Sequence, residues 1–466
     1  MDRMSPMDAS FLHIENSVAH MHIGSVGIFE GPPPSYDDFS TAIGAKLPLV
    51  PRYRQKVRSV PLDLGRPLWV DDPYFNLGYH LRHTALPAPG GDEQLRNLVG
   101  RLMAQRLDRD RPLWEMWMVE GLDDEHWALV SKVHHCMVDG VSGTDLLAVV
   151  METQREPSPA PVDDWDAEPE PSDVRLIVDA LGQRAISRYE QVRGLRALTR
   201  GWRGLGSQAL ELGRGLASMS GLARATPEST LNGPIGPHRR WDWARTTLAD
   251  VKTVRSSMGG TVNDVVLTVI TRGFRELLIS RGESVEDRVV RTLVPVSVRT
   301  EDERGTYNNR VSAMFAELPV GIGDPRERLA SIRGQMHDLK ESKQAVAGEV
   351  LTSLTGFASP MLFALGVRVA RGIPQRNLNT VTTNVPGPQQ PLYLVGRQML
   401  EAFPFVPLAN TVRIGVAIFS YNGMLNFGVT GDYDSSPDIG VLCRGIEDGM
   451  GELLKLVDEV GAPSPS

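Results

Sequence analysis

Hydrophobic and polar positions follow two different periods along the first part of the chain. The segments HMHIGSVGIFEG, LWEMWMVEGL and HWALVSKVHH show the short apolar runs and two-residue alternation of β-strands. The segment EQLRNLVGRLMAQRLD predicts an amphipathic helix, and TDLLAVVMETQ predicts a second one. The apolar side of the first helix holds Leu95, Leu98, Leu102 and Met103. We therefore expect an α/β domain over residues 1–155.

A second pattern of the same kind fills residues 233–466. TVNDVVLTVITRGFRELLISRG has apolar residues at helical spacing and predicts a long helix. RTLVPVSVRT, NTVTTNVPGP, TVRIGVAIFSYNG and MLNFGVTGDY predict strands separated by turn residues. The two halves share no repeated sequence, but both predict mixed sheets flanked by helices. We therefore expect two α/β domains of similar architecture.

The segment between these domains, residues 156–232, has a different composition. Residues 156–173 hold seven acidic residues, no basic residue and five prolines, which predicts a linker unable to order itself unaided. Residues 174–225 carry an apolar stripe at helical spacing. The opposite face holds four residues that we call the connector arginines: Arg193, Arg196, Arg200 and Arg203. Such a helix either packs on its own protein or lies on an anionic membrane surface.

Composition and charge exclude several classes of protein. The net charge of -8 argues against a general nucleic-acid binder. Two cysteines form neither a disulfide framework nor a four-cysteine zinc site, and the first residues show no secretory signal, so we expect a cytoplasmic protein. The uncharged residues 350–367 reach the lower limit for a membrane span but contain Pro360. They predict a broken core helix, a lipid-contacting wall or a span.

The motif HHCMVDG, residues 134–140, carries the candidate chemistry. It follows a predicted strand, and Gly140 permits a tight turn before the next predicted helix. Strand alternation places His135 on the face opposite His134. A neutral histidine held at a strand end can take the proton from an alcohol that attacks a carbonyl. We therefore predict that one histidine of the pair is a general base.

Other interpretations of the motif involve its remaining residues. Cys136 is either a nucleophile or a packing residue, and alternation favours packing because it directs Cys136 away from His135. Asp139 either orients the imidazole or pairs with an arginine to hold the turn. His134, His135 and Asp139 could bind a metal, but the opposed histidines disfavour this. The two histidines could also make ordinary hydrogen bonds in the core.

Blocks along nearly the whole chain resemble the bacterial wax ester synthase/diacylglycerol acyltransferase family, of the chloramphenicol acetyltransferase-like superfamily. The blocks occur in the family's order: MSPMDASFLHIE, HLRHTALPAPG, LDRDRPLWE, HHCMVDG, LNGPIGPHRR, TVNDVVL, VPVSVR, NNRVSAMFAELP, TTNVPGP and FSYNG. The resemblance implies two chloramphenicol acetyltransferase-like domains with an active-site channel between them. It also implies a structural core role for the block containing Pro112, Leu113 and Trp114. Cys136 stands where alanine is more usual in the family.

The resemblance also implies roles and substrates. His135 matches the family's catalytic base, and Asp139 matches a structural carboxylate for which Arg299 is the candidate partner. Asn263 and Asp264 match a second motif that lines or supports the site. Implied substrates are acyl-CoA and either diacylglycerol or a long-chain alcohol, with no metal and no cofactor. A peripheral association with membrane or lipid droplets is expected, with no nucleic-acid partner.

Two alternative functions remain open from the sequence. A related HHxxxDG acyltransferase could take its acyl group from a carrier protein, although no carrier-like segment is present. A non-catalytic protein of the same fold could bind membranes or coat lipid droplets, as the Arg-rich segment suggests. The intact motifs together favour the enzyme over this second alternative.

Overall fold

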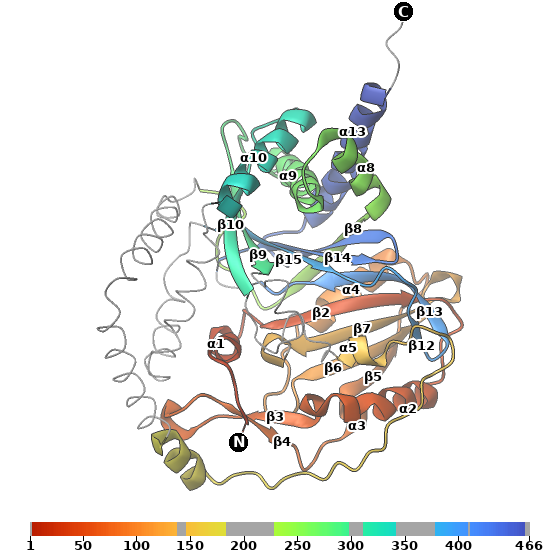
Figure 1. The fold of residues 1–466 in the computed structure, drawn as a ribbon, viewed down its shortest axis with the longest axis vertical. Helices are drawn as coiled ribbons and strands as arrows, with labels where there is room; N and C mark the ends of the chain where they lie inside the picture. The colour runs from red at the N-terminus through yellow and green to blue at the C-terminus, as the bar shows by residue number, and fades with distance from the viewer. Residues whose placement is uncertain are drawn as a thin grey trace, which may run out of the picture.

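The fold is known from a computed structural model, which describes residues 2–137, 146–182, 228–297, 311–341, 378–408 and 411–461. Two six-stranded sheets, each with its own helices, lie one above the other in Figure 1. A three-stranded sheet lies at the lower end. Its strands are β1 (Asp2–Arg3), β4 (Leu68–Asp71) and β3 (Gln55–Arg58). The expected mixed α/β fold with two sheet-containing units is confirmed.

The first six-stranded sheet is antiparallel except for one parallel pair, β5 with β6. Its order is β12 (Tyr393–Leu394), β13 (Arg397–Phe405), β2 (His22–Phe29), β7 (Trp127–His134), β6 (Trp114–Glu120) and β5 (Leu81–Ala85). Every residue of β7 is buried because both faces of this central strand are covered. In the described residues, the helices that accompany the sheet include α1 (Pro6–Ile14), α2 (Tyr36–Lys46), α3 (Leu77–His80), α4 (Asp92–Met103) and α5 (Leu146–Val150).

The second six-stranded sheet carries its helices on one face (Figure 1). Its order is β10 (Val311–Leu318), β9 (Val290–Ser297), β11 (Thr380–Pro386), β14 (Ile414–Tyr421), β15 (Met424–Asp432) and β8 (Arg239–Thr247). The helices are α8 (Leu248–Met258), α9 (Val262–Ser280), α10 (Pro325–Glu341) and α13 (Ile439–Gly461). The apolar side of α9 lies in the core of this half, as its helical periodicity predicts.

The C-terminal half contributes a hairpin to the first sheet. Strands β12 and β13 follow β11 in the chain, yet β13 pairs with β2 of the first sheet. The predicted domains, residues 1–155 and 233–466, stay a prediction. That division assigns β12 and β13 to the second domain, although they pair within the first sheet. The C-terminal half of the sequence thus completes the sheet that holds the HH motif.

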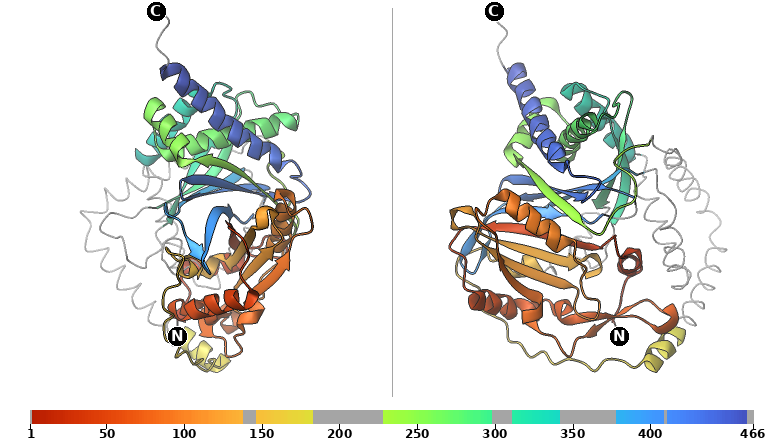
Figure 2. Two further views of the ribbon diagram at one scale, coloured as in Figure 1. Left: turned by 90° about the vertical axis from the view of Figure 1, so that its right-hand side faces the viewer. Right: turned by 180° about the vertical axis from the view of Figure 1, so that it is seen from behind.

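Helix α4 lies between the two sheets (Figure 2). Gly100 of α4 approaches the backbone of β8 so closely that a Cβ there would lie 2.8 Å from the Arg239 carbonyl oxygen. Around α4, one hydrophobic cluster joins Val26 and Val130 of the first sheet to Trp241 and Trp243 of β8. The sheets are therefore joined by a continuous packed core.

The acidic linker lies against strand β3, along the lower edge of Figure 1. Asp163 pairs with Arg54 just before β3, and Glu170 pairs with Lys56 and Arg58 at 3.2 and 3.1 Å. Residues 173–182 then form a helix whose Leu176 and Ala180 pack on the small sheet. The linker is held by opposite charges on this strand.

Several expectations are corrected or lie outside the described residues. Helix α5 (Leu146–Val150) ends earlier than TDLLAVVMETQ predicts, because the backbone of Glu152 pairs with that of Tyr393. The connector arginines and residues 350–367 lie outside the described residues. Within the described residues, no helix is both long and apolar enough to span a membrane.

Candidate active site

Strands β2 and β7, at the centre of the first sheet, hold the histidine motif at the end of β7. His134 is the last residue of β7 and pairs with His22 of β2. The prediction that β7 extends through His135 is wrong by one residue, because His135 begins a short 3-10 turn (His135–Met137). The amide of His135 still donates to the carbonyl of Met21 at 2.8 Å. The hydrogen bond to Met21 thus fixes the backbone of His135 beside the sheet, although His135 is no longer part of strand β7.

The imidazole of His135 is held from one side by helix α1. Its ring stacks on Phe11, with ring centroids 3.9 Å apart and an interplanar angle of 18°. Its Nδ1 atom is buried and, as far as the described chain shows, has no hydrogen-bond partner outside its own residue. The residue keeps some accessible surface, which therefore lies away from Nδ1. Burial lowers the pKa of His135 to about 4, so the ring is neutral at pH 7.

His134 points elsewhere, toward the end of helix α1. It is 1% exposed, and its Nε2 lies 2.7 Å from a carboxylate oxygen of Glu15. The amide of Cys136 donates to its Nδ1 at 3.2 Å. A neutral imidazole has one donor and one acceptor, so Nε2 carries the proton and donates to Glu15. Burial lowers the pKa of His134 and outweighs the hydrogen bond that it donates to Glu15, which raises the pKa.

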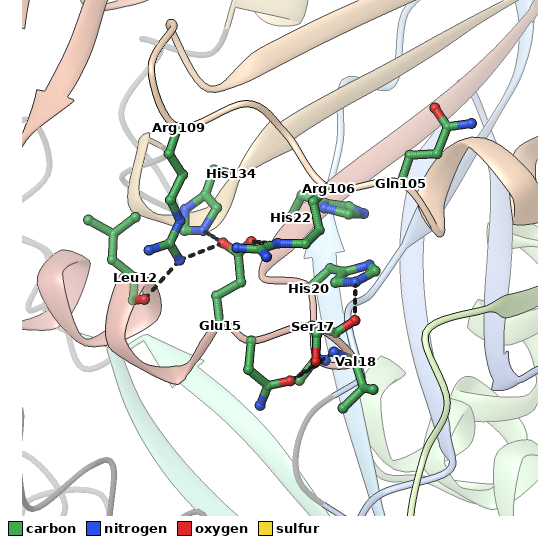
Figure 3. A network of polar contacts seen from close by, with 12 residues as sticks. Leu12, Glu15, Ser17, Val18, His20, His22, Gln105, Arg106, Arg109 and His134 are labelled. Carbon is green, nitrogen blue, oxygen red and sulfur yellow. Dashed lines mark hydrogen bonds and ion pairs between the residues drawn. The ribbon is translucent and has the colours of Figure 1, made fainter.

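Glu15 is the centre of a buried polar network that no sequence motif indicated (Figure 3). Besides His134, it accepts from Arg106 Nε and Arg109, both at 3.1 Å. Burial raises the pKa of the Glu15 carboxyl, but the bond to His134 and the charge of Arg109 outweigh it and hold the pKa well below its usual range. Arg109 also donates to the carbonyl of Leu12 at 2.9 Å. The network ties helix α1 to the loop before β6.

Cys136 makes its contacts with His134 rather than with His135. Its Sγ lies 3.0 Å from His134 Nδ1, and burial raises the pKa of the thiol well above its ordinary value. A thiol of raised pKa is a poor nucleophile because the thiolate is the reactive form. The contacts of Cys136 therefore support its packing role.

A buried ammonium and a buried neutral imidazole close the end of helix α4 beside this site. The Lys132 ammonium donates to the carbonyls of Leu102 and Gln105 at 3.1 and 2.5 Å. His22 Nε2 lies 2.7 Å from the carbonyl of Met103. These groups satisfy carbonyls that a helix end leaves unpaired. They fix the start of the loop that carries Arg106 and Arg109.

The other motif residues have the following places. Leu113 and Trp114 are buried in the core, and the Leu113 carbonyl accepts from the His134 amide at 2.9 Å. Asp264 forms a capping box with Thr261 at the start of α9. Neither Asp264 nor its half-buried neighbour Asn263 bonds to the histidine turn within the described residues. Asp139, Gly140 and Arg299 lie outside the described residues.

The two histidines do not converge on a common point. His134 meets Glu15 while His135 stacks on Phe11, an arrangement that disfavours joint metal ligation. Among the residues that the structure describes, no group of three or more His, Cys, Asp or Glu side chains gathers as metal ligands. The geometry instead offers one buried, neutral imidazole beside a buried charged network.

Comparison with known families gives this geometry its context. Residues 4–266 match the wax ester synthase/diacylglycerol acyltransferase catalytic domain, and residues 307–454 match the C-terminal domain of the same family. The chain belongs to this family. It is accordingly an acyltransferase, as the histidine motif predicts.

Relatives of this acyltransferase family match almost the full chain. A probable diacyglycerol O-acyltransferase, tgs1, of Mycobacterium tuberculosis is 38% identical over 458 residues, covering 98% of this chain and 96% of that protein. A putative diacyglycerol O-acyltransferase of the same organism is 32% identical over 473 residues, covering 98% and 91%. Both relatives therefore align with this chain over almost its full length.

Solved structures confirm the fold. The wax ester synthase/diacylglycerol acyltransferase from Marinobacter aquaeolei VT8 has a TM-score of 0.69 at 24% identity, covering 98% of this chain and 100% of that one. The first condensation domain of the calcium-dependent antibiotic synthetase has a TM-score of 0.59 at 17% identity, covering 99% and 97%. At these identities the likeness concerns the fold alone.

Proposed function

We propose that this chain transfers a fatty acyl group from acyl-CoA to the hydroxyl of diacylglycerol or of a long-chain alcohol, with His135 as general base. The observation that carries the proposal is the neutral imidazole at the end of a buried strand, on a residue that keeps some accessible surface. The choice of substrates draws on the names of the relatives, which are diacylglycerol acyltransferases and a wax ester synthase.

The reaction proposed for His135 needs no acyl-enzyme. One ring nitrogen, Nε2, takes the proton of the acceptor hydroxyl as its oxygen attacks the thioester carbonyl. The tetrahedral intermediate then expels the CoA sulfur, which receives the same proton from Nε2. Positioned general-base catalysis of this kind contributes roughly 10²–10⁴-fold. The mechanism uses no metal and no prosthetic group, since acyl-CoA is a substrate.

Other residues support the base in this proposal. Asp139 pairs with Arg299 and holds the turn after the motif, while Asn263 and Asp264 support the second domain's side of a channel between the domains. The capping box of Asp264 supports such a structural role. These four residues do not themselves exchange protons with substrate.

We further propose a cytoplasmic protein that associates reversibly with membrane or lipid droplets. The helix at residues 173–182 supports this, because its outer face bears exposed apolar residues opposite the buried Leu176 and Ala180. These outer residues are Val174, Val178 and Leu181, with 70, 63 and 51% of their surface exposed. Exposed apolar residues beside a basic amphipathic segment favour a lipid surface.

The test is turnover of palmitoyl-CoA with a panel of acceptor alcohols. Release of CoA and formation of lipid products measure this turnover. Folded His135→Ala is expected to lose activity. The matched control is His83→Ala, which changes a surface histidine of the same sheet paired with Glu120. Full activity of folded His135→Ala contradicts the assigned base. A preference for carrier-bound acyl groups over acyl-CoA contradicts the assigned donor.

A further inference from the structure

We propose that Glu15 is a positioning residue for the acyl transfer. Held by Arg106 and Arg109, its carboxylate selects the tautomer of His134, and this tautomer fixes the turn that presents His135. The inference rests on the proposed function of His135. It gives a role to the first histidine of the motif, which the proposed mechanism does not use.

The first step is the state of the carboxylate. Glu15 has a side chain only 3% exposed, yet it faces three nitrogen donors within 3.1 Å. Two of these donors belong to arginines whose side chains are 43 and 41% exposed and remain charged. Two permanent cations and one hydrogen bond keep the buried carboxylate ionised, and an ionised carboxylate only accepts hydrogen bonds.

The second step is the choice of tautomer. Because Glu15 only accepts, His134 must place its proton on Nε2, at 2.7 Å from the carboxylate. Nδ1 is then free to accept from the Cys136 amide at 3.2 Å. The opposite tautomer would leave the buried Cys136 amide without this acceptor, and buried amides require one. The hydrogen-bond acceptor at Glu15 thus decides whether the turn closes.

The third step leads from the turn to the base. Cys136 follows His135 directly, so the bond between its amide and His134 sets the direction in which the chain leaves His135. Glu15 also caps helix α1, since its amide donates to the Phe11 carbonyl at 3.1 Å. Phe11 in turn stacks on the His135 ring. Glu15 therefore affects His135 in two ways. It acts on the His135 backbone through His134 and the Cys136 amide, and on the orientation of the His135 ring through Phe11.

The experiment compares three variants of the full chain. Glu15→Leu removes the acceptor at similar volume, and Glu15→Gln keeps an acceptor oxygen. Glu30→Gln is the matched control, because Glu30 follows the far end of β2 and pairs with Arg155 at the surface. The readouts are kcat and KM for palmitoyl-CoA, and the ¹⁵N shifts of histidine-labelled protein, which distinguish the two tautomers.

The proposal expects the Nε2–H tautomer for His134 in the wild type and in Glu15→Gln, and its loss in Glu15→Leu. We expect kcat to fall at least tenfold in Glu15→Leu with KM within about twofold, and to stay within about threefold in the other two. Folded Glu15→Leu with wild-type kcat overturns the proposal, as does an Nδ1–H tautomer in the wild type.

A second variant keeps the test decisive if Glu15→Leu does not fold. Arg109→Leu changes a half-exposed side chain and loosens the same carboxylate, so we expect a kcat at least threefold lower. Unchanged kcat in that variant then overturns the proposal. If the wild type turns over no acyl-CoA and alcohol, the proposed function fails, whereas the tautomer measurement still decides the role of Glu15.

Discussion

Acidification tests the state of His135 directly, because burial lowers the pKa of its imidazole to about 4. With that pKa, about 90% of the enzyme keeps a neutral base at pH 5. With the ordinary histidine pKa of about 6.5, only about 3% does. We therefore expect kcat/KM to fall by less than about twofold between pH 7 and pH 5, and to fall steeply only near pH 4.

The same lowered pKa protects activity at acid pH but lowers the stability of the folded chain there. The folded chain binds a proton at His135 less tightly than the unfolded chain, so the free energy of unfolding decreases as the pH falls from about 6.5 to about 4. At pH 5 this contribution amounts to about 2 kcal/mol. Urea unfolding at pH 7 and pH 5 measures it, and the His135→Gln variant is expected to lack this component.

The assay follows CoA release between pH 4.5 and pH 8 at constant ionic strength, with circular dichroism at each pH to confirm folded enzyme. Initial rates after a pH jump separate protonation of the base from slow unfolding. An acid limb near pH 6.5 in protein that remains folded would refute the buried, neutral base.

Other residues give outcomes of different kinds. Cys136→Ala is expected to keep acyl transfer within about threefold, and mass spectrometry of quenched wild-type enzyme is expected to find no acyl adduct on this thiol. Asp264→Ala removes half of the capping box of α9 and is expected to lower the unfolding free energy by about 0.5–2 kcal/mol in urea, so an unchanged midpoint contradicts the capping role. Changing the connector arginines to glutamine is expected to weaken sedimentation with anionic vesicles, since each basic residue contributes about 1 kcal/mol near such a surface; unchanged binding contradicts the proposed association.

Local sequence patterns predicted individual helices and strands, because each of these forms from one contiguous segment. The periodicity of TVNDVVLTVITRGFRELLISRG predicted α9, and the run HWALVSKVHH predicted β7. Sheet membership was not predictable in this way. Strand β13 has the same local pattern whichever sheet receives it, and the choice depends on packing against β2.

The same limit applies to the site. His135 was predictable because its motif is contiguous and its strand context is local. The Glu15 network was not predictable, because its partners lie 91 residues away at Arg106 and 119 residues away at His134. The two available signs were an acidic residue directly after SFLHI and, much later in the chain, an RDR triplet. Neither sign specifies a partner.

The pairing of β13 with β2 has a consequence for folding during synthesis. Strand β2 lies near the start of the chain and β13 near its end, so the first sheet cannot close until most of the protein has left the ribosome. Until then, β2 presents an unpaired edge that invites association with other chains. We therefore expect fragments that end before β13 to aggregate during synthesis, even when they contain the whole histidine motif.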